Sequence, residues 1–241
     1  MDVNAVAGVG LQNDLKQMES ISQNLANAVT PGYKKQVVTG TSFQAQVMQL
    51  AQGGQLALSL PKLDQVAIDA SAGRLRATRD DHDVAIEGMS FFEISTPEGA
   101  AYTRQAKLRV DVNGRLVGDQ GMPVVGSGGL VMLSNSPFTI EPNGDVRQDG
   151  RVVSRLKRVR FEQAEHLLPL GQGMYGAGGA RIADANSSDP LKLGFQEASN
   201  VDSAREMVRL NETVRHFEAM TRVVQGYDDM LEKTIRKLGD F

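Results

Sequence analysis

The sequence predicts an α+β protein in which N- and C-terminal helices pair as a coiled-coil stalk around a central antiparallel, mainly-β domain. Apolar residues recur at helical spacing near both ends, whereas the middle of the chain changes to the two-residue period of β-strands. Asn-Gly and Asp-Gly pairs separate the apolar runs of the middle, as in β-hairpins. We expect residues 1–35 and 200–241 to form the helical assembly domain, 36–81 a partly extended connector, and 82–199 the β domain.

The first helix carries one apolar stripe, with steps of four and three residues. Its members are Leu11, Leu15, Met18, Ile21 and Leu25. Pro31 disfavours a helical Thr30, and Gly32 can take a positive φ, so the helix is expected to end before these residues. A helix of roughly 18 good residues is marginal alone in water, so we predict that it needs a partner.

The C-terminal segment follows a heptad pattern through four repeats, which favours a coiled coil. The positions are Met207, Leu210, Val214, Phe217, Thr221, Val224, Asp228, Leu231, Ile235 and Leu238. Asn200 is expected to cap this helix, with a capping box from Ser199 and Asp202 or from Ser203 and Glu206. Because this helix is longer than the first, pairing leaves part of its stripe uncovered, and we interpret that part as an interface.

The middle of the chain predicts several hairpins. Turns are expected at Asn113-Gly114, Asn143-Gly144 and Asp149-Gly150, and a strand over 156–161. The glycine- and serine-rich stretch 171–190 is expected to be a loop. The sequence QAQVMQLAQGGQLALSL (44–60) is expected to be a partly extended connector.

Composition limits the function classes. Lys and Arg number 26 and Asp and Glu 29, so the net charge of −3 argues against binding nucleic acid through a basic surface. Cysteine is absent, which excludes disulfides and thiolate metal sites. No window of about 18 apolar residues could span a membrane. The N-terminus shows no cleaved secretory signal, and taken alone this indicates a cytosolic protein.

The candidate chemical sites are weak. His82 lies among Asp80, Asp81 and Asp83, but no second histidine stands at ligand spacing, so an acidic turn explains it better. Residues 171–176 match GxGxxG without a following helix, and 111–114 begin like a calcium loop that no glutamate closes. We predict no catalytic, metal or cofactor site, and no enzyme.

One basic cluster stands out near the end of the β domain. Its members are Arg151, Arg155, Lys157, Arg158 and Arg160. Aromatic residues are scarce around it, so we interpret it as a solvated or subunit-contacting strand face in preference to an RNA site.

Three ordered motifs resemble bacterial flagellar axial proteins, the rod and hook subunits. The N-terminal signature is carried by Asn24, Leu25, Ala26, Asn27, Thr30, Gly32, Tyr33 and Lys34. The C-terminal one is carried by Glu197, Ser199, Asn200 and Val201, with the Arg215-His216-Phe217-Glu218 run after it. Residues 83–92 resemble the family's D-V-A-I-x-G-x-G-F-F, with Ser90 in place of the second glycine.

The resemblance implies a structural subunit of the flagellar basal-body rod that transmits torque and binds no cofactor. It implies self- and hetero-assembly through the terminal helices with other rod subunits, and no nucleic acid or small-molecule substrate. It also implies the export apparatus as a partner and a periplasmic location in the basal body, without a cleaved signal peptide, in place of the cytosol. The expected assembly residues are the five of the first stripe with Met207, Leu210, Val214, Phe217, Val224, Leu231, Ile235 and Leu238.

Alternatives remain open at this point. Length and the short connector are most like the proximal-rod subunits, but distal-rod and hook-type subunits share the motifs. From another class, the helices could form an intramolecular stalk that presents a ligand-binding β domain. A hydrolase is the third and weakest alternative.

Overall fold

The computed structural model describes residues 3–39 and 65–239, and the chain divides into two compact units. Unit 1 comprises Met1–Leu25, Gln36–Val66 and Asp202–Phe241. Unit 2 comprises Ala26–Lys35 and Ala67–Val201. The predicted connector over 44–60 lies outside the described residues.

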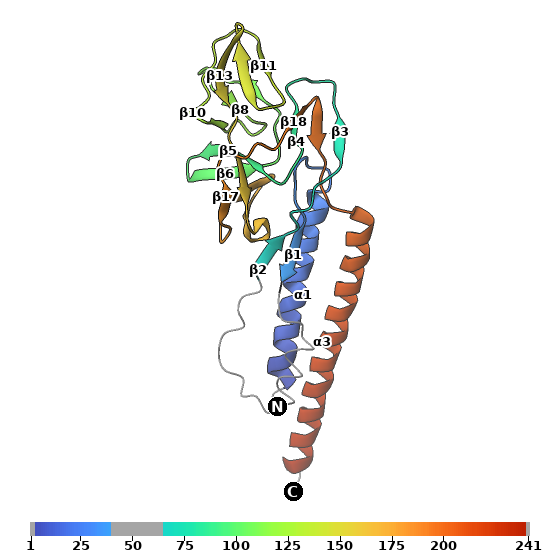
Figure 1. Ribbon diagram of the computed structural model, residues 1–241. Coiled ribbons are helices and arrows are strands. Elements are labelled where there is room, and N and C mark those ends of the chain that lie inside the picture. Colours follow the sequence, from blue (N-terminus) through green and yellow to red (C-terminus); the bar gives the residue numbers. More distant parts are fainter. Residues whose placement is uncertain (1–2, 40–64, 240–241) are drawn as a thin grey trace. The chain divides into compact units, whose positions relative to one another are not determined.

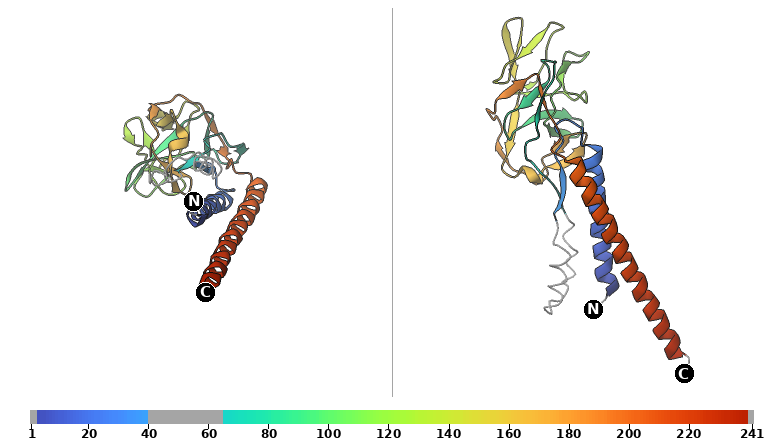
Figure 2. Two further views of the ribbon diagram at one scale, coloured as in Figure 1. Left: turned by 90° about the horizontal axis from the view of Figure 1, so that it is seen from below. Right: turned by 90° about the vertical axis from the view of Figure 1, so that its right-hand side faces the viewer.

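Unit 1 is built on two long helices, α1 (Val3–Ala26) and α3 (Ser203–Gly239). They lie side by side and run in opposite directions, as Figure 1 and the right-hand view of Figure 2 show. Side-chain contacts give the direction, because Asn24 meets Glu206 while Asp14, ten residues earlier, meets His216, ten residues later. The strands β1 (Gln36–Thr39) and β2 (Gln65–Ile68) pair as a two-stranded sheet. No helix of the described residues is long and apolar enough to cross a membrane.

The start of α3 differs from the expectation. Asp202, and not Asn200, occupies the capping position, since its Oδ1 accepts the backbone N–H of Arg205 at 3.1 Å. The Asn200 side chain instead accepts the backbone N–H of Lys35 at 2.7 Å. Asn200 was a reasonable capping candidate by residue type, but a long-range partner takes its side chain.

Unit 2 is mainly β, and the strand pairings recorded for it are antiparallel. A six-stranded sheet has the order β15-β16-β6-β5-β14-β17, and a three-stranded sheet the order β11-β12-β13. Shorter ladders join β7 with β8, β9 with β10, β4 with β18 and β3 with β19. The strands are β3 (Leu75–Ala77), β4 (Val84–Ile86), β5 (Phe91–Thr96), β6 (Gly99–Thr103), β7 (Arg109–Val110), β8 (Leu116–Val117), β9 (Val125–Gly126), β10 (Gly129–Leu130), β11 (Phe138–Ile140), β12 (Asp145–Gln148), β13 (Arg151–Arg155), β14 (Arg158–Phe161), β15 (Leu168–Gly171), β16 (Met174–Gly176), β17 (Ile182–Asp184), β18 (Leu191–Leu193) and β19 (Phe195–Glu197). A short 3-10 helix covers Ala164–His166.

The predicted hairpin turns are confirmed. Asn113-Gly114 joins β7 to β8, Asn143-Gly144 joins β11 to β12, and Asp149-Gly150 joins β12 to β13. Asp149 and Gly150 both have positive φ, 51° and 78°, which suits a hairpin with the right-handed twist of its strands.

The loop expected over 171–190 is wrong. This stretch contains β16 and β17, two strands of the six-stranded sheet. Tyr175 pairs with Tyr102 and is buried, and its ring meets Phe91 edge to face at 5.9 Å. Strands of three residues show too little periodicity to be seen in the sequence, and their order depends on pairing with neighbouring strands of the sheet.

Two apolar clusters fill unit 2. The larger draws on β4, β5, β6, β8, β11, β12 and β18 with loops between them, and Phe92, Leu116 and Val146 are among its most buried side chains. The smaller surrounds Phe91, Val159 and Tyr175 on the six-stranded sheet. These clusters hold the strands that carry the polar site described next.

Candidate functional site

A cluster of three buried charges joins the motif segments inside unit 2. The Lys34 Nζ lies 2.6 Å from Glu197 Oε1, and the Arg104 Nε lies 2.6 Å from Glu197 Oε2. All three side chains are at most 3 % exposed. Each carboxylate oxygen of Glu197 therefore has its own cation, in the geometry that a buried anion requires.

The two cations are also satisfied by backbone groups. Lys34 Nζ donates to the carbonyl of Ser71 at 2.6 Å, and Glu197 Oε1 accepts the backbone N–H of Gly73 at 2.7 Å. The Arg104 guanidinium donates to the carbonyl of Gly88 at 2.9 Å and to that of Ser90. The guanidinium thus binds the turn between β4 and β5 to the carboxylate.

Burial and charge act in opposite directions on Glu197. Burial alone would raise the pKa of its carboxyl group, but Arg104 and then Lys34 hold that pKa below its ordinary value. Burial lowers the pKa of the Lys34 ammonium, against the effect of Glu197. Burial raises the pKa of Tyr175, whose hydroxyl accepts the Lys34 backbone N–H at 2.6 Å. The tyrosine thus stays a neutral phenol that positions the backbone of Lys34.

Backbone contacts align the segment 32–35 with 197–200. The N–H of Gly32 donates to the carbonyl of Glu197 at 2.7 Å, and the Asn200 side chain accepts from Lys35 and donates to the carbonyl of Asp69 at 2.9 Å. Gly32 has φ +67°, and a Cβ there would lie 2.9 Å from the backbone carbon of Arg104. Only glycine fits this position, for both reasons.

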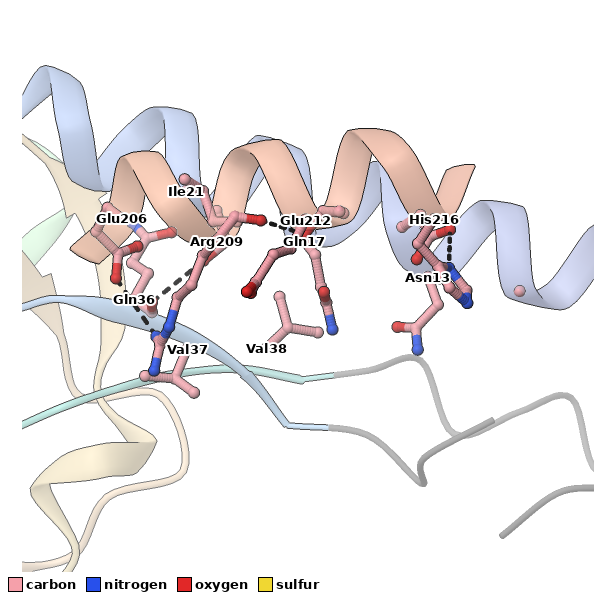
Figure 3. Close-up of a pocket in the computed structure, with 14 residues that line it drawn as sticks. Asn13, Gln17, Ile21, Gln36, Val37, Val38, Glu206, Arg209, Glu212 and His216 are labelled. Carbon is pink, nitrogen blue, oxygen red and sulfur yellow. Dashed lines mark hydrogen bonds and ion pairs between the residues drawn. The ribbon is translucent and has the colours of Figure 1, made fainter. Parts of the chain in front are cut away.

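A second polar region lies within unit 1, in a hollow of about 580 Å³ between α1, β1 and α3 (Figure 3). Its walls include Asn13 and Gln17 of α1, Gln36 and Val37 of β1, and Arg209 of α3. The Asp14 Oδ2 and His216 Nδ1 atoms are 2.7 Å apart at one part of its wall, and Asn24 hydrogen-bonds Glu206 near another. Here the facing sides of the two helices are joined by polar groups.

Two family models match the chain. One, described as flagellar hook protein FlgE/F/G D1 domain, matches residues 85–153, and the other, flagellar basal body rod FlgEFG protein C-terminal, matches residues 192–237. The chain belongs to the flagellar basal-body rod proteins. The family is a structural one, located in the flagellar basal body, and neither description names an enzyme.

Curated relatives cover almost the whole chain. The rod protein FlgF of Mesorhizobium japonicum is 28 % identical over 93 % of this chain and 92 % of its own length. The rod protein FlgG of Buchnera aphidicola subsp. Schizaphis graminum is 29 % identical, over 95 % of this chain and 96 % of its own. FlgF of Salmonella typhimurium is 29 % identical over 89 % of each chain. The rod protein is therefore FlgF-like, with FlgG relatives at similar identity.

The motif residues of this rod protein serve two sites. Gly32, Tyr33, Lys34, Glu197 and Asn200 are part of the buried cluster in unit 2 or of the aligned segments beside it. Asn24 belongs to the polar contacts of unit 1. Leu25, Ala26, Asn27 and Thr30 lie at the end of α1 and in the turn after it, where Thr30 donates to the carbonyl of Asn27 at 3.1 Å. Ser199 Oγ accepts the backbone N–H of Val201 at 3.2 Å.

The predicted assembly residues have mixed environments in the single chain. Ile21 is buried; Leu11, Met18, Leu25, Leu210, Phe217 and Val224 are half-buried; Leu15, Met207, Val214 and Ile235 are exposed. The side chains of Leu231 and Leu238 lie outside those described. Their assignment to an assembly interface stays a prediction.

The other candidate sites have structural explanations. His82 Nδ1 lies 3.2 Å from Asp80 Oδ1 and its ring packs on Phe138 at 4.6 Å. The GxGxxG match covers the end of β15, the turn at Gln172 and Gly173, where both residues have positive φ, and strand β16. Within the described residues no group of three His, Asp or Glu could hold a metal ion.

The basic cluster is not uniformly solvated, contrary to expectation. Arg158 is buried and donates to the carbonyls of Asn143 and Asp189. Arg155 pairs with Asp145 at 2.6 Å and Lys157 with Glu93 at 2.8 Å. Arg151 and Arg160 are exposed.

The buried ion cluster was not predicted from the sequence. Lys34 and Glu197 stood out only as members of two motifs and Arg104 not at all, and the separation of the three along the chain hides their pairing. The available signal was one charged residue in each terminal motif, Lys34 as the last residue of the N-terminal motif and Glu197 as the first of the C-terminal one.

Proposed function

We propose that this rod protein assembles with other flagellar rod components through α1 and α3, and that the assembled helices carry torque. Exposed apolar side chains on α3 are the observation that supports this proposal. Met207, Val214 and Ile235 lie on the predicted stripe and are 59 %, 36 % and 68 % exposed. An exposed row of apolar side chains on a helix is characteristic of a surface that another helix covers.

The lengths of the two helices also support assembly through a surface of α3. α1 has 24 residues and α3 has 37. If the antiparallel alignment given by Asn24–Glu206 and Asp14–His216 continues, Val3 lies level with Tyr227. The part of α3 after Tyr227 then has no residue of α1 beside it, and we propose that α1 and α3 form a coiled coil completed by helices of neighbouring subunits.

We further propose a periplasmic position in the proximal rod, reached through the flagellar export apparatus. The FlgF relatives support the proximal position, and the equally similar FlgG relatives favour the distal rod as the second candidate. Locating the subunit in purified basal bodies, with labelled FlgF- and FlgG-type neighbours as references, distinguishes the two.

The experiment that tests the assembly surface compares aspartate substitutions on two faces of α3. Val214→Asp and Ile235→Asp are expected to abolish swimming and the incorporation of the subunit into basal bodies, because a buried unpaired carboxylate costs several kcal/mol. Ala219→Asp is the matched control, since Ala219 is exposed on the opposite side of α3 and should tolerate the same charge. Normal incorporation of Val214→Asp and Ile235→Asp would contradict the proposal and favour a binding module with a complete intramolecular stalk.

A further inference from the structure

The side-chain amide of Asn24 is held in one orientation by β1. Its Oδ1 accepts the backbone N–H of Gln36 at 2.7 Å, and its Nδ2 donates to the carbonyl of the same residue at 2.9 Å. Because one backbone residue takes both ends of the amide, the O and N atoms cannot be exchanged without losing both bonds. Nδ2 also donates to Glu206 Oε2, at 3.0 Å, across to α3.

Glu206 accepts the hydrogen bond that this oriented amide donates. It is 1 % exposed although it lies in the first turn of α3, and Arg209 Nη1 lies 3.4 Å from its other oxygen. A buried carboxylate is tolerated only where donors reach it, and the loss of one partner costs far more than the loss of an exposed contact. Ten residues further along α3, His216 Nδ1 lies 2.7 Å from Asp14 Oδ2 of α1.

The face of α3 that packs on α1 differs from the face that the heptad pattern predicts. The heptad pattern places Met207 and Val214 beside Leu210 and Phe217. In the structure Glu206 and Thr213 are buried, whereas Met207 and Val214 are exposed. Apolar burial alone favours the opposite arrangement, since each buried aliphatic side chain contributes about 1.5–3 kcal/mol. Some other interaction must therefore decide which face of α3 meets α1.

We infer that the Asn24–Glu206 hydrogen bond, with the Asp14–His216 contact, selects the face of α3 that packs on α1 and keeps Met207 and Val214 at the surface. A single polar residue in a helix interface can fix the arrangement of the helices at a cost in stability. Turning α3 to bury Met207 would withdraw Glu206 from the amide that β1 holds in place. Only the further step, that the exposed side chains then serve another subunit, rests on the proposed function.

Thiol labelling of single-cysteine variants tests the inference, because the chain has no cysteine of its own. Thr213→Cys and Val214→Cys are compared in dilute, full-length protein. Thr213 is 6 % exposed and Val214 is 36 % exposed, so Val214→Cys should react about tenfold faster, which corresponds to about 1.4 kcal/mol of local protection. In the Asn24→Leu/Glu206→Leu background the ratio should fall to one or below, because α3 turns to bury Met207 and Val214.

The control background is Gln12→Leu/Glu218→Leu, which replaces an amide of α1 and a carboxylate of α3 at exposed positions. It should keep the tenfold ratio. An unchanged ratio in the Asn24→Leu/Glu206→Leu background would overturn the inference. Fast labelling of both thiols would overturn it too, since the contacts would then hold the helices together without choosing a face.

Circular dichroism accompanies each measurement to show that the helices are retained. If the Asn24→Leu/Glu206→Leu variant loses its helices, the labelling comparison is made in a Glu206→Ala background, because this substitution removes the carboxylate without adding bulk. Labelling is measured on the unassembled chain, so its outcome is independent of whether the aspartate variants of α3 assemble.

Discussion

Glu197 lies between two buried cations, and this position determines how unit 2 responds to substitution. Its oxygens contact Lys34 and Arg104 at 2.6 Å each, and also the backbone N–H of Gly73. The contacts join segments that are far apart in the sequence. The cluster is therefore a structural site, and its net effect on stability depends on complete pairing.

Neutralising this carboxylate should destabilise unit 2 strongly. Glu197→Gln keeps the shape of the side chain but leaves Lys34 and Arg104 without an anion, so the expected loss is about 3–5 kcal/mol in the free energy of unfolding. Urea denaturation followed by tyrosine circular dichroism measures it, because the chain has no tryptophan and Tyr33, Tyr102 and Tyr175 all belong to unit 2. Glu98→Gln, at an exposed turn, is the control and should change stability by less than about 0.5 kcal/mol.

The stabilisation by Glu197 should also depend on pH. Arg104 and Lys34, opposing the effect of burial, hold its pKa below the ordinary value of 4.5. The contribution of Glu197 to the free energy of unfolding is therefore complete when the pH lies above that ordinary pKa. It is lost as the pH falls through the lower pKa of the folded protein. The difference in stability between the unchanged chain and Glu197→Gln should therefore shrink between pH 5 and more acidic conditions, in urea titrations at a series of pH values. A difference independent of pH would show that the carboxylate is not the source of the stability.

At the scale of elements, local turn chemistry was sufficient to predict the hairpins. Asn143-Gly144 and Asp149-Gly150 lie where the sequence placed them, because positive φ is available to few residues besides glycine, asparagine and aspartate. The strands β16 and β17 were missed, since each has three residues and depends on distant neighbours. The face of α3 that meets α1 also differed from the heptad pattern, because polar contacts with partners far along the chain outweighed apolar periodicity.

The N-terminus of α3 gives a test at this scale. Asp202→Ala removes the acceptor for the Arg205 N–H and should lower the stability of α3 by about 1 kcal/mol. Helical circular dichroism during thermal unfolding measures the change. Asp229→Ala, at an exposed position within α3, is the matched control and should be neutral or slightly stabilising, because alanine favours the helix interior. Equal effects of the two substitutions would argue against a capping role for Asp202.

For the whole molecule, the sequence predicted helical ends and an antiparallel β middle, which the structure shows. It also predicted the flagellar family, with which the family models and relatives agree. The buried ion cluster could not be predicted from the sequence, because Lys34 and Glu197 are 163 residues apart and only the fold brings them together. The proposed assembly surface stays a prediction, since the contacts proposed to complete it belong to other subunits.

Peptide-resolved hydrogen exchange tests the assembly claim most directly, on the dilute chain and on assembled rods. In the dilute chain, β5 and β6 should exchange most slowly, residues 205–224 of α3 at an intermediate rate, and residues 228–239 fastest. In assembled rods, residues 228–239 should become as protected as β5, because helices of other subunits then cover them. Strong protection of 228–239 in the dilute monomer, or continued fast exchange in the rod, would contradict the account.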